Sequence, residues 1–458
     1  MSKTAFASDL SLRQRLDTAS MGRLQWRAIA LCFLINAIDG IDVLVMAFTA
    51  SAVASDWDLN PVVLGWLLSA GIIGMTLGSV FLTPLSDRWG RRPMVLGSLA
   101  AAGAFMVATE WVQDPWTLGM LRLLTGVGIG CSIVNANVLT SEYANARWRA
   151  LAIGLQSVGF ALGATLGGML AAYLLKRGAW QHVFVWGGFL TWGAAVLVAL
   201  GLPESLDQLL QGRKKGDVQR AQQLLQRMGH GHFSVELQTT VRPKPSALQA
   251  LQLLWAPGAV RTWLLGGSFF ALMFSFYFVT SWTPKLLEQA GLSAEKGVAG
   301  GVLLHVGGMF GALALGVLAS RWQLQRVAQS LMVLGAVALC VVIPATGWSL
   351  PIAILLGVAI GFLINGSIAG LYATAPQSFE AATRSSGVGI VLAFARLGGM
   401  ASPVVAGHLL QANWSVASLY WLYAGTLLVA ALFLQGFLAQ QREARGPLRE
   451  DGLVLLKE

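Results

Sequence analysis

The chain repeats one pattern twelve times: a run of about 20 mostly apolar residues followed by a polar segment. An α-helix rises about 1.5 Å per residue, so about 20 residues cross the roughly 30 Å of hydrocarbon in a bilayer. The strands of a membrane β-barrel would instead alternate apolar and polar residues, and this alternation is absent from the sequence. The pattern therefore predicts an all-α membrane protein with 12 transmembrane helices. The runs lie near residues 26–54, 62–84, 94–112, 116–139, 150–175, 182–202, 260–284, 297–320, 327–345, 350–374, 385–410 and 415–438.

The amino-acid composition agrees with a membrane location. Hydrophobic residues make up 55% of the chain and charged residues only 11%, whereas about a quarter of a soluble domain is charged. The net charge of +10 would suggest nucleic-acid binding in a soluble protein. In a membrane protein it indicates which side of the bilayer each loop occupies, and we expect no nucleic-acid partner.

Lysines and arginines orient the chain across the membrane. With a cytoplasmic N-terminus, the cytoplasmic segments hold 25 of the 31 lysines and arginines, and the outward segments hold four. Cytoplasmic loops of membrane proteins carry such an excess of positive charge. One span more or fewer would reverse every later loop and remove the bias. Both termini are therefore predicted to be cytoplasmic.

One long polar stretch separates the first six spans from the last six. Within it, Leu224, Leu225 and Met228 share one face of a predicted helix. This pattern favours a linker with a surface helix, and a regulatory docking site is the alternative. The predicted regions are a cytoplasmic tail (1–25), a six-helix bundle (26–202), a cytoplasmic central loop (203–256), a second six-helix bundle (257–438) and a cytoplasmic tail (439–458).

The two halves share short sequence echoes. Arg149-x4-Gly154-x8-Gly163 recurs 235 residues later as a motif that begins at Arg384, and the Arg-Trp pair of 87–89 recurs at 320–322. Transporters are often built from repeated bundles with a substrate pathway between the repeats. The echoes therefore indicate a duplication of six spans.

Several of these motifs resemble those of the major facilitator superfamily. The loop 87–92 is similar to its signature loop, and 122–130 and 159–168 are similar to its fourth-span and fifth-span motifs. There are departures: Thr83 stands where the loop motif usually begins with glycine, Ser320 replaces the acid in the second copy, and Ala164 replaces a proline common in drug antiporters. The last departure argues against an exporter.

A narrower resemblance is to the aromatic acid:proton symporters. Asp39-Gly40-Ile41-Asp42 is similar to the first-span signature of that family, and 281–284 and 396–399 resemble its seventh and eleventh spans. The resemblance implies a monomer in the bacterial inner membrane. Its implied function is proton-coupled uptake of a small aromatic carboxylate, such as benzoate or a hydroxybenzoate, by alternating access.

Ionisable residues within the predicted spans are the candidate site. Counted from the span ends, Asp39, Asp42, Arg122, His305 and Arg396 fall in one layer near the bilayer midplane, where carriers place their sites. Two aspartates three residues apart share a helical face and repel, so at least one should hold a proton more readily than in water.

The resemblance and the chemistry of buried charges give these residues expected roles. Asp39, Asp42 and Arg122 would couple protons; the alternative is that the acids pair with Arg122 only to enter the membrane safely. Arg396 would bind the substrate carboxylate with its forked donors. The alternative is a helix-packing arginine paired with Asp39 or Asp42. His305, Trp282 and Tyr277 complete the expected substrate site, although a lone histidine is often only a satisfied polar group. The expected gating residues at the cytoplasmic helix ends are Asp87, Arg88, Arg91, Glu142 and Arg384, and anchoring is the alternative for Glu142 and Arg384.

Other functional classes have less support. The sequence has no phosphate-binding loop, HExxH or GxSxG motif, so we expect no enzyme and no cofactor or metal. The expected partners are the substrate, protons and the lipid bilayer. Two alternatives stay open: an exchanger or symporter of a non-aromatic acid such as muconate or a dicarboxylate, and a non-transporting sensor of aromatic acids.

Overall fold

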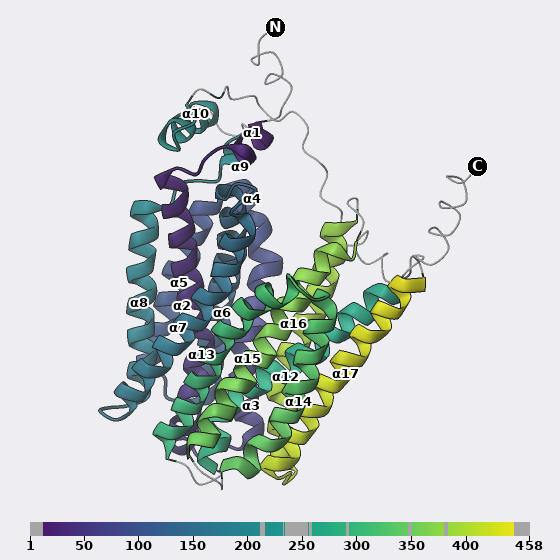
Figure 1. The fold of residues 1–458 in the computed structure, drawn as a ribbon. Helices are drawn as coiled ribbons and strands as arrows, with labels where there is room; N and C mark the ends of the chain where they lie inside the picture. Colours follow the sequence, from purple (N-terminus) through teal and green to yellow (C-terminus); the bar gives the residue numbers. More distant parts are fainter. Residues whose placement is uncertain are drawn as a thin grey trace, which may run out of the picture. The chain divides into compact units, whose positions relative to one another are not determined.

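A computed structural model describes residues 12–210, 216–231, 233, 255, 259–289, 293–346, 350–379 and 383–443. Within this part of the chain, 12 helices are long and apolar enough to cross a membrane, as the sequence predicts. Figure 1 shows them as long helices. Their elements are α2 (Arg23–Asp56), α3 (Pro61–Leu77) continued by short turns to Trp89, α5 (Arg91–Ala108), α6 (Pro115–Tyr143), α7 (Arg149–Leu175), α8 (Gln181–Gly201), α12 (Ala259–Gln289), α13 (Ala294–Ala319), α14 (Leu324–Thr346), α15 (Leu350–Thr374), α16 (Arg384–Gln411) and α17 (Val416–Glu443).

The helices form two compact units. Unit 1 comprises Met1–Trp57 with Ala70–Pro243, and unit 2 comprises Asp58–Ser69 with Lys244–Glu458. The segment Asp58–Ser69 joins unit 2 because the start of α3 packs tightly on α16. A Cβ atom on Gly65 would lie 2.6 Å from the carbonyl oxygen of Pro403. The Ser69 hydroxyl donates to the carbonyl of Met400 at 3.0 Å.

Glycines bring α2 and α7 of unit 1 into backbone contact. A Cβ atom on Gly163 of α7 would lie 1.8 Å from the carbonyl oxygen of Ala37. A Cβ atom on Gly40 of α2 would lie 2.0 Å from the carbonyl oxygen of Phe160. Small residues allow this approach, on which helix association in lipid depends. The contacting residues of α2, Ala37 and Gly40, lie on either side of Asp39 in the sequence. The contact therefore fixes the helix that carries Asp39 against α7.

Unit 2 repeats this packing at the positions of the sequence echo. Helices α7 and α16 begin at Arg149 and Arg384, the two arginines that the echo aligns. Gly398 of α16 packs on α12 as Gly163 packs on α2, because its Cβ atom would lie 2.3 Å from the carbonyl oxygen of Phe270. The repeated glycine therefore has the same structural role in each half.

The second span ends in a change of helical winding. The π-helical turn Gly78–Leu82 is followed by the 3₁₀ turn Thr83–Leu85 and the short helix α4 (Ser86–Trp89). The chain then turns at Gly90, whose φ of +119° is in the region that favours glycine. This turn starts α5 and places Arg91 and Arg92 at its first positions.

Helix α6, which carries Arg122, has a well-defined start. The Asp114 carboxylate accepts hydrogen bonds from the Thr117 hydroxyl at 2.6 Å and the Thr117 amide at 2.9 Å. Pro115 follows at the first helical position, where no amide donor is needed. The bonds from Thr117, above all that from its hydroxyl, lower the pKa of Asp114.

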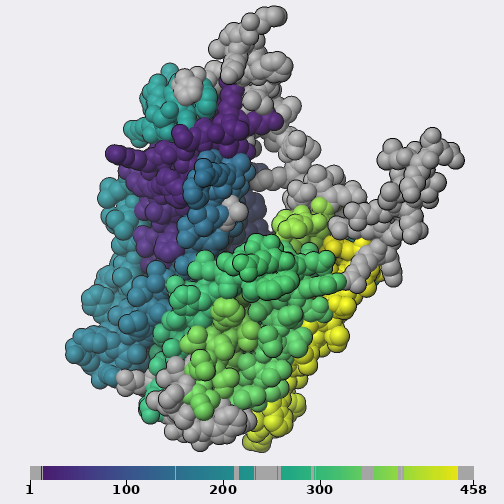
Figure 2. All heavy atoms as spheres, in the orientation of Figure 1, coloured from purple at the N-terminus to yellow at the C-terminus, as the bar shows by residue number. Residues whose placement is uncertain are grey.

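Three short helices lie together at one end of unit 1 (Figures 1 and 2). They are α1 (Leu12–Thr18), α9 (Leu206–Leu209) and α10 (Asp217–Arg227). Their apolar side chains join the core cluster of the unit, with Leu16 and Leu206 among them. The predicted apolar face of α10, formed by Leu224, Leu225 and Met228, is buried there. The structure thus has a helix in the stretch where the sequence predicts one, and this helix packs into unit 1.

The α2–α7 contact predicts the effect of adding a single methyl group. We expect Gly163→Ala to lower the free energy of unfolding by about 1–3 kcal/mol, because its Cβ would overlap the Ala37 carbonyl and force the helices apart. Thermal unfolding of the purified protein in detergent measures this effect. Gly154→Ala on the same helix is the matched control, since its Cβ would meet nothing within 4 Å. Equal midpoints for the two variants would contradict the packing role of Gly163.

Candidate functional site

Two charged side chains of unit 1 meet inside the membrane-spanning region. Nη2 of Arg122 in α6 donates to Oδ1 of Asp42 in α2 at 2.9 Å. The side chains are only 3% and 4% exposed. A charge at the centre of a membrane helix costs about 2.5–3.5 kcal/mol on insertion scales, and an opposite charge in contact offsets part of that cost. The structure thus brings together two of the three residues expected to couple protons.

An aromatic ring covers the guanidinium of Arg122. Its Cζ atom lies 5.0 Å from the centre of the Phe184 ring in α8, within the range of a cation–π interaction. Phe184 is fully buried. The Nε atom of Arg122 has no hydrogen-bond partner among the described residues. One face of the guanidinium therefore contacts Phe184, Nη2 is bonded to Asp42, and the Nε–H donor is unused within the described structure.

Asp39 lies one turn before Asp42 on α2 and is also buried. The next turn carries Asn36, whose side-chain amide donates to Oε1 of Gln156 in α7 at 2.7 Å. Asn36 and Gln156 are both buried, so α2 presents three successive polar turns to the interior of unit 1. The charges that define the candidate site in the sequence do not point to this amide pair. Its only signal in the sequence is the presence of two uncharged polar residues within apolar spans.

Arg396 of unit 2 is half-buried on α16. One turn further along the same face is Gly399, which packs against the ring of Tyr277 in α12: a Cβ atom there would lie 2.6 Å from a ring carbon. Tyr277 is also half-buried and lies edge-on to Phe276 at 5.2 Å. Arg396 and Tyr277, two of the residues expected to bind substrate, therefore lie within one helical turn of the contact between α16 and α12.

Trp282 and His305 are placed differently. Trp282 is fully buried, and its indole N–H donates to the carbonyl of Pro403 at 3.2 Å, which ties α12 to α16. His305 is 2% exposed within α13. Near Trp282, the rings of Phe278 and Tyr423 stack almost parallel with their centres 3.8 Å apart. The stacked rings of Phe278 and Tyr423 fill the interior of unit 2 between α12 and α17.

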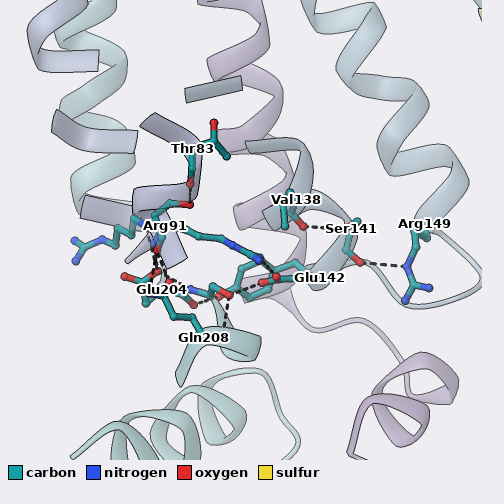
Figure 3. Close-up of polar contacts among 12 residues, drawn as sticks. Thr83, Arg91, Val138, Ser141, Glu142, Arg149, Glu204 and Gln208 are labelled. Carbon is teal, nitrogen blue, oxygen red and sulfur yellow. Dashed lines mark hydrogen bonds and ion pairs between the residues drawn. The ribbon is translucent and has the colours of Figure 1, made fainter. Parts of the chain in front are cut away.

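A second polar cluster lies where α5 starts, at the end of the π-helical span (Figure 3). The Arg91 side chain forms an ion pair with Glu142 at the end of α6. The backbone amides of Arg91 and Arg92 donate to Oε1 of Glu204 at 3.1 and 3.0 Å. The Ser205 hydroxyl donates to Glu142 at 2.6 Å. Glu204, whose part in the cluster the sequence did not indicate, thus caps the first turn of α5.

The other residues expected in the gate are more dispersed. Asp87 is half-buried and Arg88 is exposed on α4. Arg384 begins α16, and its side chain lies outside the described part of the structure. Arg149, the residue of unit 1 that aligns with Arg384, forms an ion pair with Asp17 of α1 and donates to the carbonyl of Ser141 at 3.1 Å. Of the five expected gating residues, the structure brings Arg91 and Glu142 into contact.

The described residues contain no group of three or more His, Cys, Asp or Glu side chains that could hold a metal ion. A sequence profile of the Major Facilitator Superfamily matches residues 29–379. The chain belongs to this superfamily. It is a membrane transporter, not an enzyme, and a multi-pass protein of the bacterial inner membrane.

Curated relatives and solved structures agree with this assignment. The chain is 30% identical to a gallate transporter of Pseudomonas putida, over 94% of this chain and 96% of that protein. It is also 30% identical to the 4-hydroxybenzoate transporter PcaK of Pseudomonas aeruginosa, over 94% and 96% of the two chains. The xylose transporter XylE of Escherichia coli, in a partially occluded inward-open conformation, matches with a TM-score of 0.70 at 16% identity, over 90% of this chain and 99% of XylE. The match to XylE shows that the chain has the major facilitator fold.

The cluster at the start of α5 predicts a local effect of Glu204. We expect Glu204→Ala to speed deuterium exchange at the Arg92 amide by about tenfold or more, because a hydrogen bond to a charged acceptor contributes about 1.5–3 kcal/mol. Mass spectrometry of the peptide spanning residues 90–94 measures the exchange. Glu110→Gln at the opposite end of the same span is the control. Unchanged exchange in Glu204→Ala would contradict its capping role.

Proposed function

We propose that this superfamily member imports a small aromatic carboxylate together with protons. The observation that carries the proposal is the buried Arg122–Asp42 ion pair, one turn from a second buried carboxylate. The names of the relatives, transporters of gallate and 4-hydroxybenzoate, support the substrate class. Both named substrates combine an aromatic ring with one carboxylate.

The charges of the buried layer provide a reason for proton coupling. Asp39, Asp42 and Arg122 carry a net charge of −1 when both carboxylates are ionised. Uptake of one proton makes the group neutral, which lowers the cost of keeping it in low dielectric. A carrier must change the exposure of this layer during alternating access, and a neutral group passes through the change at a lower cost. Protonation of the pair from outside would therefore permit reorientation.

Arg396 is the proposed ligand of the substrate carboxylate. Its guanidinium has five donors in a planar fork that matches two carboxylate oxygens. Tyr277, one turn away through Gly399, is the proposed contact for the aromatic ring. Asp87, Arg88, Arg91, Glu142 and Arg384 are proposed to gate the cytoplasmic side. His305 and Trp282 are proposed to support the substrate site from the interior of unit 2, since both are buried.

The orientation follows from the distribution of positive charge. With both termini in the cytoplasm, the cluster at Arg91 and Glu142 lies on the cytoplasmic side. One proton carried with one monoanion moves no net charge, so only the pH gradient would drive the transport. A second proton would add about 2.3 kcal/mol per 100 mV of membrane potential.

Replacing the paired aspartate tests the coupling. We expect Asp42→Asn to lose accumulation of labelled benzoate against a gradient in proteoliposomes, because an amide cannot exchange a proton. Counterflow exchange, which needs no net proton movement, should persist and shows that the variant is folded. Asp56→Asn, at the end of the same helix where Asp56 accepts from the Trp180 indole, is the control. Uphill accumulation by Asp42→Asn would refute the coupling role.

Replacing the proposed carboxylate ligand tests the substrate site. We expect Arg396→Gln to raise the KM for benzoate about 10- to 100-fold, the equivalent of one charge-assisted hydrogen bond or more. Uptake kinetics measure the change, with Arg177→Gln on an exposed helix end as control. Weak inhibition of the wild-type protein by neutral benzamide would agree with recognition of the carboxylate. An unchanged KM in Arg396→Gln would assign the residue to helix packing.

The remaining alternatives differ in what they transport. A counterflow assay with ring-substituted benzoates, muconate and linear dicarboxylates separates an aromatic-acid carrier from a carrier of other organic acids. A sensor would bind benzoate without flux. Preferential exchange of muconate or dicarboxylates, or binding with no exchange of any compound, would overturn the proposed substrate class.

A further inference from the structure

An open hollow lies at the turn between α13 and α14 of unit 2. Its volume is about 520 Å³. The end of α13, the turn and the first two turns of α14 form its walls, so it belongs to neither the buried layer nor the cluster at Arg91. Its lining residues are Leu318, Arg321, Trp322, Gln323, Arg326, Val327, Ser330 and Leu331.

The hollow is basic, and none of its lining residues is acidic. Arg321 and Arg326 line it, and residues 318–331 include no aspartate or glutamate. Neither arginine takes part in an ion pair among the described residues. The corresponding loop of unit 1 contains an internal ion pair, between Arg91 and Glu142. Ser320, which replaces the acid of this loop motif, leaves the two guanidinium groups without a carboxylate nearby in sequence.

An apolar, outward-facing surface continues from the hollow along α14. Arg326 and Ser330 are exposed at its rim. On the following turns of the same face, Val333, Leu334 and Val337 are 41%, 54% and 58% exposed. In a membrane-spanning helix such side chains face lipid. Trp322, 61% exposed at the rim, is a residue type enriched at the membrane–water interface.

We propose that this hollow binds the phosphate headgroup of an anionic phospholipid from the cytoplasmic leaflet. The guanidinium groups of Arg321 and Arg326 pair with the phosphate oxygens, and Gln323 and Ser330 supply further polar contacts at the rim. The acyl chains lie along the apolar surface at Val333, Leu334 and Val337. This continuity of a basic hollow with a lipid-facing surface favours a lipid over a free phosphate ion, which would gain nothing from the apolar part.

Lipid titration of the full-length protein in detergent tests the proposal. Native mass spectrometry counts bound phosphatidylglycerol on the wild type and on the double variant Arg321→Gln/Arg326→Gln. We expect the double variant to bind its tightest phosphatidylglycerol about 30-fold more weakly, from about one charge contact for each arginine. The matched control is Arg220→Gln/Arg227→Gln, which removes the same charge from the exposed side of α10. The control should bind as the wild type does.

Three further measurements on the wild type keep the proposal testable if the variant fails to fold. Zwitterionic phosphatidylcholine should not displace phosphatidylglycerol, and inorganic phosphate at equal concentration should not compete with it. Binding should also weaken as salt is raised, because the contact is electrostatic. Equal affinity for phosphatidylcholine, full competition by inorganic phosphate, or equal loss of binding in both double variants would each overturn the proposal.

Discussion

Hydrocarbon offers no hydrogen-bond partner, and this constraint governs where the protein can place a polar group. In unit 1, two polar contacts within the spans join side chains of different helices: Arg122 with Asp42, and Asn36 with Gln156. An ion pair placed there gives up solvation that only a precise partner restores. For helix packing alone, apolar side chains would serve without this loss of solvation. We therefore associate the buried ion pair with transport and not with packing.

The same constraint explains the glycines. With apolar side chains facing both lipid and neighbouring helices, there is little hydrophobic gain from helix association, and close backbone contact has to supply it. Gly163 of α7 packs on α2, and Gly398 of α16 packs on α12. In each half, the fifth helix therefore contacts the first. Asp39 and Asp42 lie on the helix fixed in this way in unit 1, and Tyr277 lies on its counterpart in unit 2. These three candidate residues thus occur on helices held by close backbone contact.

The sequence predicted the twelve helices well because a span is defined by length and apolarity, which are local properties. It also aligned Arg149 with Arg384, at which α7 and α16 begin. It could not predict partners. Which side chain lies against Arg122, and that Glu204 caps α5, depend on how helices distant in sequence are packed. The 0% exposure of Trp282 could not be foreseen either, because interface tryptophans and buried ones have the same sequence environment.

The loops after the second and eighth spans show how one motif can diverge after duplication. In unit 1 the arginine at the start of α5 is neutralised by Glu142, and the α5 amides are capped by Glu204, so the turn is tied to the ends of α6 and α8. In unit 2 Ser320 stands in place of the acid, and Arg321 and Arg326 border an open hollow. Among the described residues neither arginine has an ion-pair partner, so each stays in water or pairs with an external anion. At a membrane surface the most abundant external anion is the lipid phosphate, so the loop of unit 2 is suited to a lipid contact where the loop of unit 1 has an internal ion pair.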